Sequence, residues 1–170
     1  QGKVTRWNQV NAAWPDSPIK LISPDQTSGD TTFFNDTVLG TGAAARKDTM
    51  GSGEDAVIVQ AVGRDIYAVG YVPLAYYNGN AGKLRAVPVA ASAGSPAVVP
   101  NIENVARGLY QPLSRPVLLY INTVSLAKPD VVGFAEYLVA NGAQWAKEAR
   151  YAPLLESAYR EGLARVRART

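Results

Sequence analysis

A run of small polar residues, Ser28-Gly29-Asp30-Thr31-Thr32, has the residue types that bind a tetrahedral anion. It follows a β-prone stretch at 18–23 and precedes apolar positions with helical spacing, so we expect it at the start of a helix. The first N–H groups of a helix lack intrahelical acceptors, and the helix dipole favours negative charge there. Gly29 allows close approach, and the hydroxyls of Ser28 and Thr31 can donate to a phosphate or sulfate oxygen. The same residue types also act as ordinary helix caps, so both interpretations stay open.

Arg46 and Asp48 form a second candidate group, in a loop at 40–53 that can fold back on this turn. A guanidinium makes bidentate contacts with an oxyanion, and a carboxylate accepts a hydrogen bond from a protonated ligand oxygen. The alternative is that both side chains are simply solvated. Arg115 precedes an apolar run and is a further charged candidate, with a hinge contact or an ion pair as its alternative roles.

The composition argues against catalysis, because the chain of 170 residues has no cysteine and no histidine. These absences remove thiolate chemistry, the commonest general base and the commonest transition-metal ligand. We therefore expect no enzyme, no metal and no cofactor. The net charge of +3 is modest, and the late arginines stand four residues after glutamates, at 156/160 and 161/165. This spacing favours the solvated side of a terminal helix over a nucleic-acid surface.

The elements that must position the turn alternate between strands and helices, which indicates an α/β domain with helices on both faces of a mixed, mostly parallel sheet. The helix beginning at 54 has Ser52 as its expected N-cap. Val117-Leu118-Leu119-Tyr120-Ile121 is almost continuously apolar, so we expect a central strand buried on both faces. The other predicted strands are 18–23, 66–72 and 84–89, and the predicted helices are 7–14, 33–40, 54–62, 101–108, 130–141 and 153–167.

Several phrases of the sequence resemble the PstS-type phosphate-binding proteins. The most distinctive is Tyr110-Gln111-Pro112-Leu113-Ser114-Arg115-Pro116, followed by the apolar run and the late Tyr151-Ala152-Pro153-Leu154. The others are 14–19 before the polar turn, 52–62, 68–71 and 75–77. The similarity runs over nearly all of the chain.

The resemblance implies a periplasmic-binding-protein-like lobe with a helical C-terminus over residues 1–170. These would be the second lobe and C-terminal helices of a two-lobed clamshell, with the N-terminal lobe absent from this chain or supplied by a partner chain. Family members bind inorganic phosphate between the lobes and pass it to the membrane subunits of an ABC importer. The expected location is the periplasm or cell envelope, with an export signal that is not present in this chain.

The resemblance also implies a phosphate site in which Ser28 and Gly29 are contacts and Arg46 is the cationic clamp. Asp30 departs from the family, where threonine is usual, and its carboxylate repels a dianion unless it accepts a ligand proton or turns away. Thr31 is then the candidate to replace that threonine. The alternative function is an interaction or sensory module that keeps the fold without tight anion binding. The expected phosphate-binding residues are Ser28, Gly29, Asp30, Thr31, Arg46 and Asp48.

Overall fold

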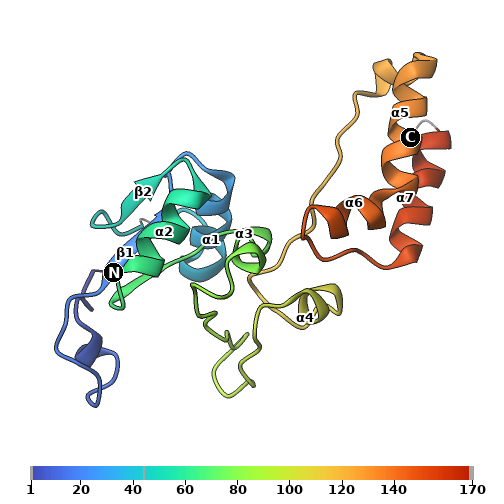
Figure 1. The fold of residues 1–170 in the computed structure, drawn as a ribbon. Helices are drawn as coiled ribbons and strands as arrows, with labels where there is room; N and C mark the ends of the chain where they lie inside the picture. Colours follow the sequence, from blue (N-terminus) through green and yellow to red (C-terminus); the bar gives the residue numbers. More distant parts are fainter. Residues whose placement is uncertain (1, 44, 169–170) are drawn as a thin grey trace. The chain divides into compact units, whose positions relative to one another are not determined.

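A computed structural model describes residues 2–43 and 45–168. The chain divides into two compact units, Gln1–Val87 and Pro88–Thr170. Each unit has its own elements and its own buried residues, so we describe them separately (Figure 1).

The first unit is built on a parallel sheet with the strand order β2-β1-β3. The central strand pairs Ile22 with Met50 on one side and with Gly70 on the other. A parallel sheet with intervening helices confirms the predicted α/β class. In chain order the elements are η1 (Trp7–Gln9), β1 (Lys20–Pro24), α1 (Gly29–Leu39), β2 (Met50–Ser52), α2 (Asp55–Arg64), β3 (Ala68–Gly70) and α3 (Leu74–Gly79).

The core of this unit joins the sheet to α2, which packs against β1 and β3. Ile22 of β1 is buried, as are Ile58 and Val59 of α2. Of the apolar positions of the predicted helix at 54–62, Ile58 and Val59 therefore face the sheet, whereas Val57 is exposed. On α1, the ring of Phe34 stacks on Tyr71, which follows β3, with 4.2 Å between centroids. These contacts fix the start of each helix relative to the strand ends.

The second unit is mainly helical; two of its buried residues, Ala135 and Val166, lie on the packed pair α5 and α7, and a third, Leu126, lies on η2. Pro129 occupies the first turn of α5, where its missing N–H costs nothing. Asn101 caps α4, because its side-chain oxygen accepts from the Asn104 N–H at 2.7 Å. No helix in the described residues is long and apolar enough to cross a membrane. The elements are α4 (Ile102–Ala106), η2 (Thr123–Ala127), α5 (Pro129–Ala140), α6 (Gly142–Glu148) and α7 (Glu156–Ala168).

Two arginines of α7 form ion pairs. One of these pairs, Arg165 with Glu161, has the four-residue spacing noted in the sequence. Arg165 contacts Glu161 at 2.6 Å, and Arg167 contacts Glu136 of α5 at 3.0 Å. Both arginine side chains are largely exposed, so these pairs contribute little to stability. These arginines place positive charge on the solvent-exposed side of α7.

Five predictions about local structure are wrong. The expected loop at 40–53 contains β2 near its end. The stretch 84–89 is no strand, because Pro88 interrupts it and only an isolated bridge joins Val89 to Val98. Residues 117–121 form no strand and have none beside them among the described residues, and all of them except the half-buried Ile121 are exposed. Ser52 is not the N-cap of α2, since β2 ends there and Glu54 takes that place. The predicted helix at 7–14 is only the short η1.

Gly70 allows β3 to lie close against β1, and we expect Gly70→Ala to destabilise the first unit. A Cβ at this position would lie 2.4 Å from the Ile22 carbonyl oxygen and 3.1 Å from Val62 Cγ2. Because the first of these is backbone, relief requires the strands to move, and overpacking of this kind costs about 1–3 kcal/mol of unfolding free energy. Urea unfolding followed by circular dichroism measures this loss.

The matched control is Gly133→Ala in α5, where a Cβ meets nothing within 4 Å. Alanine is the better helix former by about 1 kcal/mol, so this variant should be as stable as the wild type or more stable. Equal stability of Gly70→Ala and wild type would show that the close strand approach is not a constraint.

Candidate phosphate site at the carboxyl ends of the strands

All three strands of the first unit end at the same edge of the sheet, because they are parallel. The turn after β1 leads into α1, the turn after β2 leads into α2, and Tyr71 directly follows β3. The first two turns are in contact, since the Asp25 N–H donates to the Ser52 carbonyl at 3.1 Å. In open α/β sheets this edge is where ligands bind. The predicted polar turn at 28–32 therefore lies at the expected edge.

The start of α1 presents backbone hydrogen-bond donors that have no acceptor among the described residues. Ser28 is the N-cap: its Oγ accepts from the Asp30 N–H at 3.1 Å, and its carbonyl accepts from the Thr32 N–H at 3.1 Å. Within residues 2–43 and 45–168, the backbone N–H groups of Gly29 and Thr31 have no acceptor. Both donors belong to the first turn of an eleven-residue helix, where the dipole favours an anion. Capping by Ser28 therefore leaves two backbone donors of this turn without an acceptor among the described residues.

Thr31 holds the turn in place with its side chain. This residue is buried, and its hydroxyl lies 2.8 Å from the Asp25 carbonyl and 3.1 Å from the Pro24 carbonyl, to which it donates. The Tyr71 hydroxyl donates to the hydroxyl oxygen of Thr31 at 3.3 Å. The one hydroxyl proton of Thr31 is thus committed to the backbone. The side chain does not take the place of the family threonine at position 30, and only the Thr31 N–H remains for a ligand.

Arg46 and Asp48 form a bidentate ion pair. Arg46 donates from Nε to Oδ1 at 2.9 Å and from Nη2 to Oδ2 at 2.6 Å, and Nη1 donates to the Val4 carbonyl at 2.7 Å. The hydrogen bond to Asp48 raises the pKa of Arg46 and lowers the pKa of the Asp48 carboxyl. In the described part of the chain, no hydrogen bond or ion pair connects this pair to Ser28, Gly29 or Thr31. The structure brings the two charged residues together, separately from the turn.

Asp55 lies at the same edge and is a candidate that its residue type and spacing did not indicate. It is the first residue of α2, and burial, together with the charge of Asp30, raises the pKa of its carboxyl. The two carboxylates therefore act on each other across the starts of two helices. Asp25 adds a third carboxylate to this edge, because a Cβ on Gly51 or Gly53 would lie 3.1 Å from its oxygens. The described residues include no cluster of three or more ligating side chains placed to hold a metal ion.

The pKa shift of Asp55 predicts a pH-dependent gain in stability for Asp55→Asn. The folded state holds the proton more tightly than the unfolded state, so ionisation of Asp55 opposes folding. This cost is absent well below the ordinary carboxyl pKa of 3.8 and is complete above the raised value. The variant should thus be more stable than the wild type at pH 7, and this difference should disappear by about pH 3.

Urea unfolding at several pH values measures that difference. Asp30→Asn removes the neighbouring charge and should give part of the same gain. If Asp55→Asn is less stable than the wild type at neutral pH, the carboxylate at the start of α2 stabilises the fold and our electrostatic account of this edge is wrong.

Comparison with known proteins identifies the family of this chain. A family model described as a PBP superfamily domain matches residues 1–141. The protein SphX of Synechocystis sp. is 40% identical over 160 residues, which cover 94% of this chain and 47% of the relative. The phosphate-binding protein PstS of Staphylococcus haemolyticus is 31% identical over 165 residues, covering 95% of this chain and 50% of the relative. The chain spans about half the length of the curated relatives it matches.

A solved structure agrees with these sequence relatives. It is the crystal structure of a possible phosphate binding protein from Planctomyces limnophilus, similar with a TM-score of 0.79 and 32% identity. The match covers 98% of this chain and 59% of that chain. The matching family model, the parallel sheet and this similarity show that the chain belongs to the PBP superfamily and has the fold of PstS-type phosphate-binding proteins.

Proposed function

We propose that this chain binds inorganic phosphate at the start of α1, as part of the solute-binding component of a phosphate importer. The observation that carries the proposal is the pair of unused N–H groups of Gly29 and Thr31 beside the capping hydroxyl of Ser28. Backbone donors at a helix start bind a tetrahedral oxyanion without a lysine. The names of two relatives, a phosphate-binding protein and a possible phosphate binding protein, support phosphate as that anion.

The Ser28 hydroxyl contributes a third donor in this proposal. Its oxygen accepts from the Asp30 N–H, which leaves the hydroxyl proton available to a ligand oxygen. Three donors from one turn then surround one side of the anion. The negative charge of the ligand also lies at the positive end of α1.

Arg46 supplies the positive charge. Three of its five N–H donors are occupied by Asp48 and the Val4 carbonyl, so one donor remains on each terminal nitrogen. Two parallel donors match two oxygens of a phosphate. Asp48 and Asp30 are acceptors in the proposal: a protonated phosphate oxygen can donate to a carboxylate, whereas sulfate carries no proton at neutral pH. The site should therefore prefer phosphate to sulfate.

The remainder of the binding cleft is proposed to come from an N-terminal lobe, in the same polypeptide or in a partner chain. Residues 1–170 are then the second lobe with its C-terminal helices. One lobe alone leaves the anion open to water, so affinity should be weak until the other lobe closes over it. Delivery to the membrane subunits of an ABC importer, export to the periplasm and the absence of catalysis complete the proposal.

A second candidate function is an interaction or sensory module without tight anion binding. The carboxylates of Asp30 and Asp55 favour it, because they influence each other at the helix starts and repel a dianion. Under this candidate the turn at 28–31 is only a helix cap. Phosphate affinity separates the two functions.

Calorimetric titration of the chain with phosphate and with sulfate tests the proposal. We expect saturable heat with phosphate and at least tenfold weaker binding of sulfate. The same titration is repeated on a fusion to the unmatched half of the Synechocystis SphX relative, in which affinity should rise. Absence of phosphate heat from both proteins would reject phosphate binding and favour the second candidate.

A further inference from the structure

Tyr71 joins the end of β3 to the first turns of α1 through two contacts. Its hydroxyl lies 3.3 Å from the hydroxyl oxygen of Thr31, to which it donates. Its ring stacks on Phe34, with 4.2 Å between centroids and 6° between the ring planes. Thr31 and Phe34 stand three residues apart on α1 and therefore lie on the same face of this helix. One polar and one aromatic contact together fix both the position and the rotation of the helix start.

The contact with Thr31 is part of a hydrogen-bond chain across the carboxyl edge of the sheet. Tyr71 donates to the Thr31 oxygen, and the Thr31 hydroxyl donates to the Asp25 carbonyl at 2.8 Å. The Asp25 N–H then donates to the Ser52 carbonyl at 3.1 Å. The chain thus links the ends of all three strands. Because Thr31 both accepts and donates, the first turn of α1 is held from β3 and from β1.

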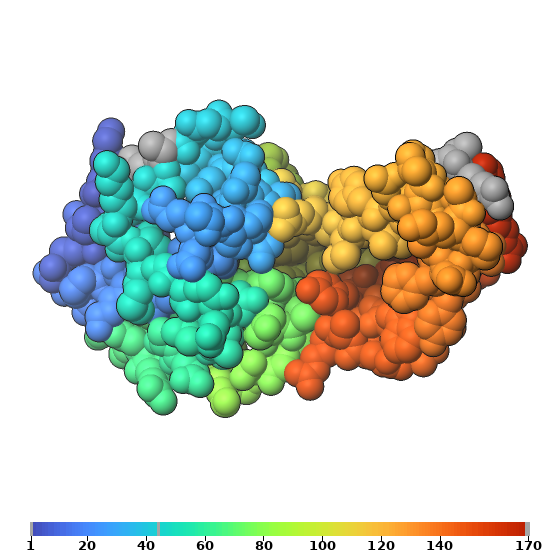
Figure 2. Space-filling model, turned by 90° about the horizontal axis from the view of Figure 1, so that it is seen from above, coloured from blue at the N-terminus to red at the C-terminus, as the bar shows by residue number. Residues whose placement is uncertain are grey.

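This arrangement leaves the outer side of the turn open to a ligand. Gly29 is exposed, whereas Thr31 is buried and Tyr71 is half-buried. Atoms of α1 lie at the surface of the first unit in the space-filling view (Figure 2). The one proton of the Tyr71 hydroxyl is given to Thr31, so this side chain has no donor left for an oxyanion. Tyr71 therefore acts on the turn and not on the ligand.

We propose that Tyr71 is a positioning residue for the oxyanion cradle, by which we mean the Ser28 hydroxyl and the N–H groups of Gly29 and Thr31. Donors bind an oxyanion well only when they already point to one place, because ordering a mobile turn on binding costs affinity. The Tyr71 hydroxyl orders the turn before the ligand arrives. This inference rests on the proposed phosphate site and adds to it a residue that does not touch phosphate.

Tyr71→Phe is the variant that tests the role, because it keeps the ring on Phe34 and removes only the hydroxyl. Calorimetric titration should show phosphate binding weakened by about three- to tenfold, the range expected for the loss of one neutral hydrogen bond. NMR relaxation in phosphate-free buffer should show increased motion of the Gly29 and Thr31 N–H groups. The amide of Val59, buried in α2, should not change. A contribution to stability alone would leave the motion of the folded state as it is.

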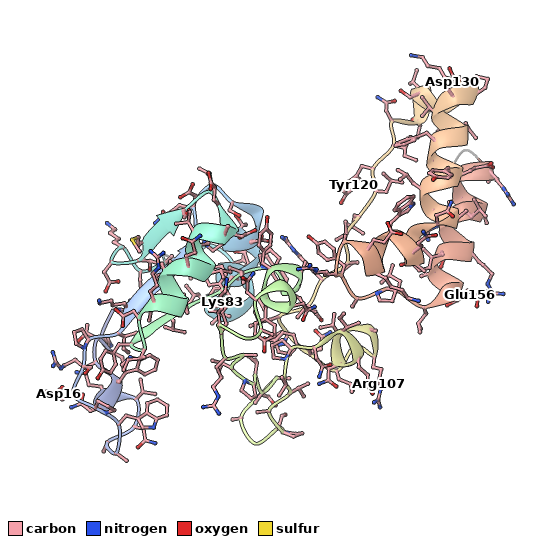
Figure 3. All side chains as sticks on the ribbon, viewed as in Figure 1. Asp16, Lys83, Arg107, Tyr120, Asp130 and Glu156 are labelled. Carbon is pink, nitrogen blue, oxygen red and sulfur yellow. The ribbon has the colours of Figure 1, made fainter. Side chains whose placement is uncertain are left out.

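Two further variants make the result specific to the Tyr71–Thr31 contact. Thr31→Val removes the acceptor, so adding Tyr71→Phe to it should change phosphate affinity by less than about twofold. Tyr76→Phe is the matched control and should bind phosphate like the wild type, because it loses a tyrosine hydroxyl on a residue that is 43% exposed. Tyr76 lies on α3, shortly before the labelled Lys83 (Figure 3).

The possible failures are distinguishable. Unchanged motion of the Gly29 and Thr31 amides in Tyr71→Phe would overturn the positioning role, and weaker binding in that case would mean that the hydroxyl contacts the ligand directly. Increased motion with undiminished phosphate affinity would also overturn it, since order at the turn would then not matter for binding. Increased motion with no phosphate heat from the variant or the wild type would instead reject the phosphate site and leave the hydrogen-bond chain standing.

Discussion

Gly29→Pro is expected to weaken phosphate binding by about ten- to a hundredfold while leaving α1 intact. Proline has no N–H, so the substitution removes one of the two unused donors at the start of the helix. Gly29 is the first helical residue, where proline is well tolerated, and Ser28 before it has the extended backbone that a following proline requires, with φ −69° and ψ 138°. A hydrogen bond to a charged group is worth about 1.5–3 kcal/mol, which gives the expected factor.

Gly29→Ala is the matched control, because it keeps the backbone N–H and only adds a methyl group at a helical position. Calorimetric titration with phosphate should separate the two variants, and circular dichroism should show the same helix content in both. If the proline variant binds phosphate as well as the alanine variant, the Gly29 N–H is not a ligand contact and the anion does not lie at this turn.

Arg46→Ala is expected to weaken phosphate binding by more than tenfold. The substitution removes a charged contact worth about 1.5–3 kcal/mol and leaves Asp48 without its cation, so that an unpaired carboxylate repels the ligand. The side chain is only 21% exposed and holds the Val4 carbonyl, so some loss of stability is also expected. Titration at a temperature well below the unfolding transition separates the two effects.

Two controls accompany this variant. Arg107→Ala removes an exposed arginine of an i,i+4 pair in the second unit and should leave phosphate binding unchanged. Arg46→Lys keeps a positive charge but not the fork that holds Asp48 and Val4 together, and should bind with intermediate affinity. Unchanged affinity of Arg46→Ala would mean that the Arg46–Asp48 pair is structural and that the site lacks this clamp.

The part of the fold around β1 and α1 could be predicted from the sequence because each step has a local signal. The β-prone stretch before Pro24 becomes β1, and the polar turn caps α1 through Ser28. The helices predicted at 130–141 and 101–108 likewise become α5, which begins at Pro129, and α4, which Asn101 caps. Caps and prolines act within a few residues, so these predictions needed no knowledge of tertiary partners.

The wrong predictions concern features that depend on distant partners. Residues 84–89 and 117–121 have strand composition, but β-propensity becomes a strand only where a neighbouring strand is present. β2 was missed for the converse reason, since Met50-Gly51-Ser52 has little strand character and is a strand only because β1 pairs with it. Pairing, rather than composition, decides each case.

The site was predictable to the same extent. Ser28 and Gly29 occupy the helix start that their residue types indicated, and the carboxyl edge of the sheet holds them. Two other features follow from tertiary contacts that residue spacing does not reveal. The Thr31 hydroxyl donates to the backbone, and Asp55 lies close enough to Asp30 to feel its charge. The parallel register of β1 and β2 is what brings the starts of α1 and α2 together.

The most direct test of the central claim is a phosphate titration of the isotopically labelled chain followed by amide NMR. We expect the amide signals of Gly29, Asp30 and Thr31 to move together and to saturate, because their N–H groups lie at the start of α1 where the anion should bind. Sulfate at the same concentrations should move them less. Saturable shifts elsewhere with no movement at these three amides, or no shifts at all, would contradict a phosphate cradle at this helix.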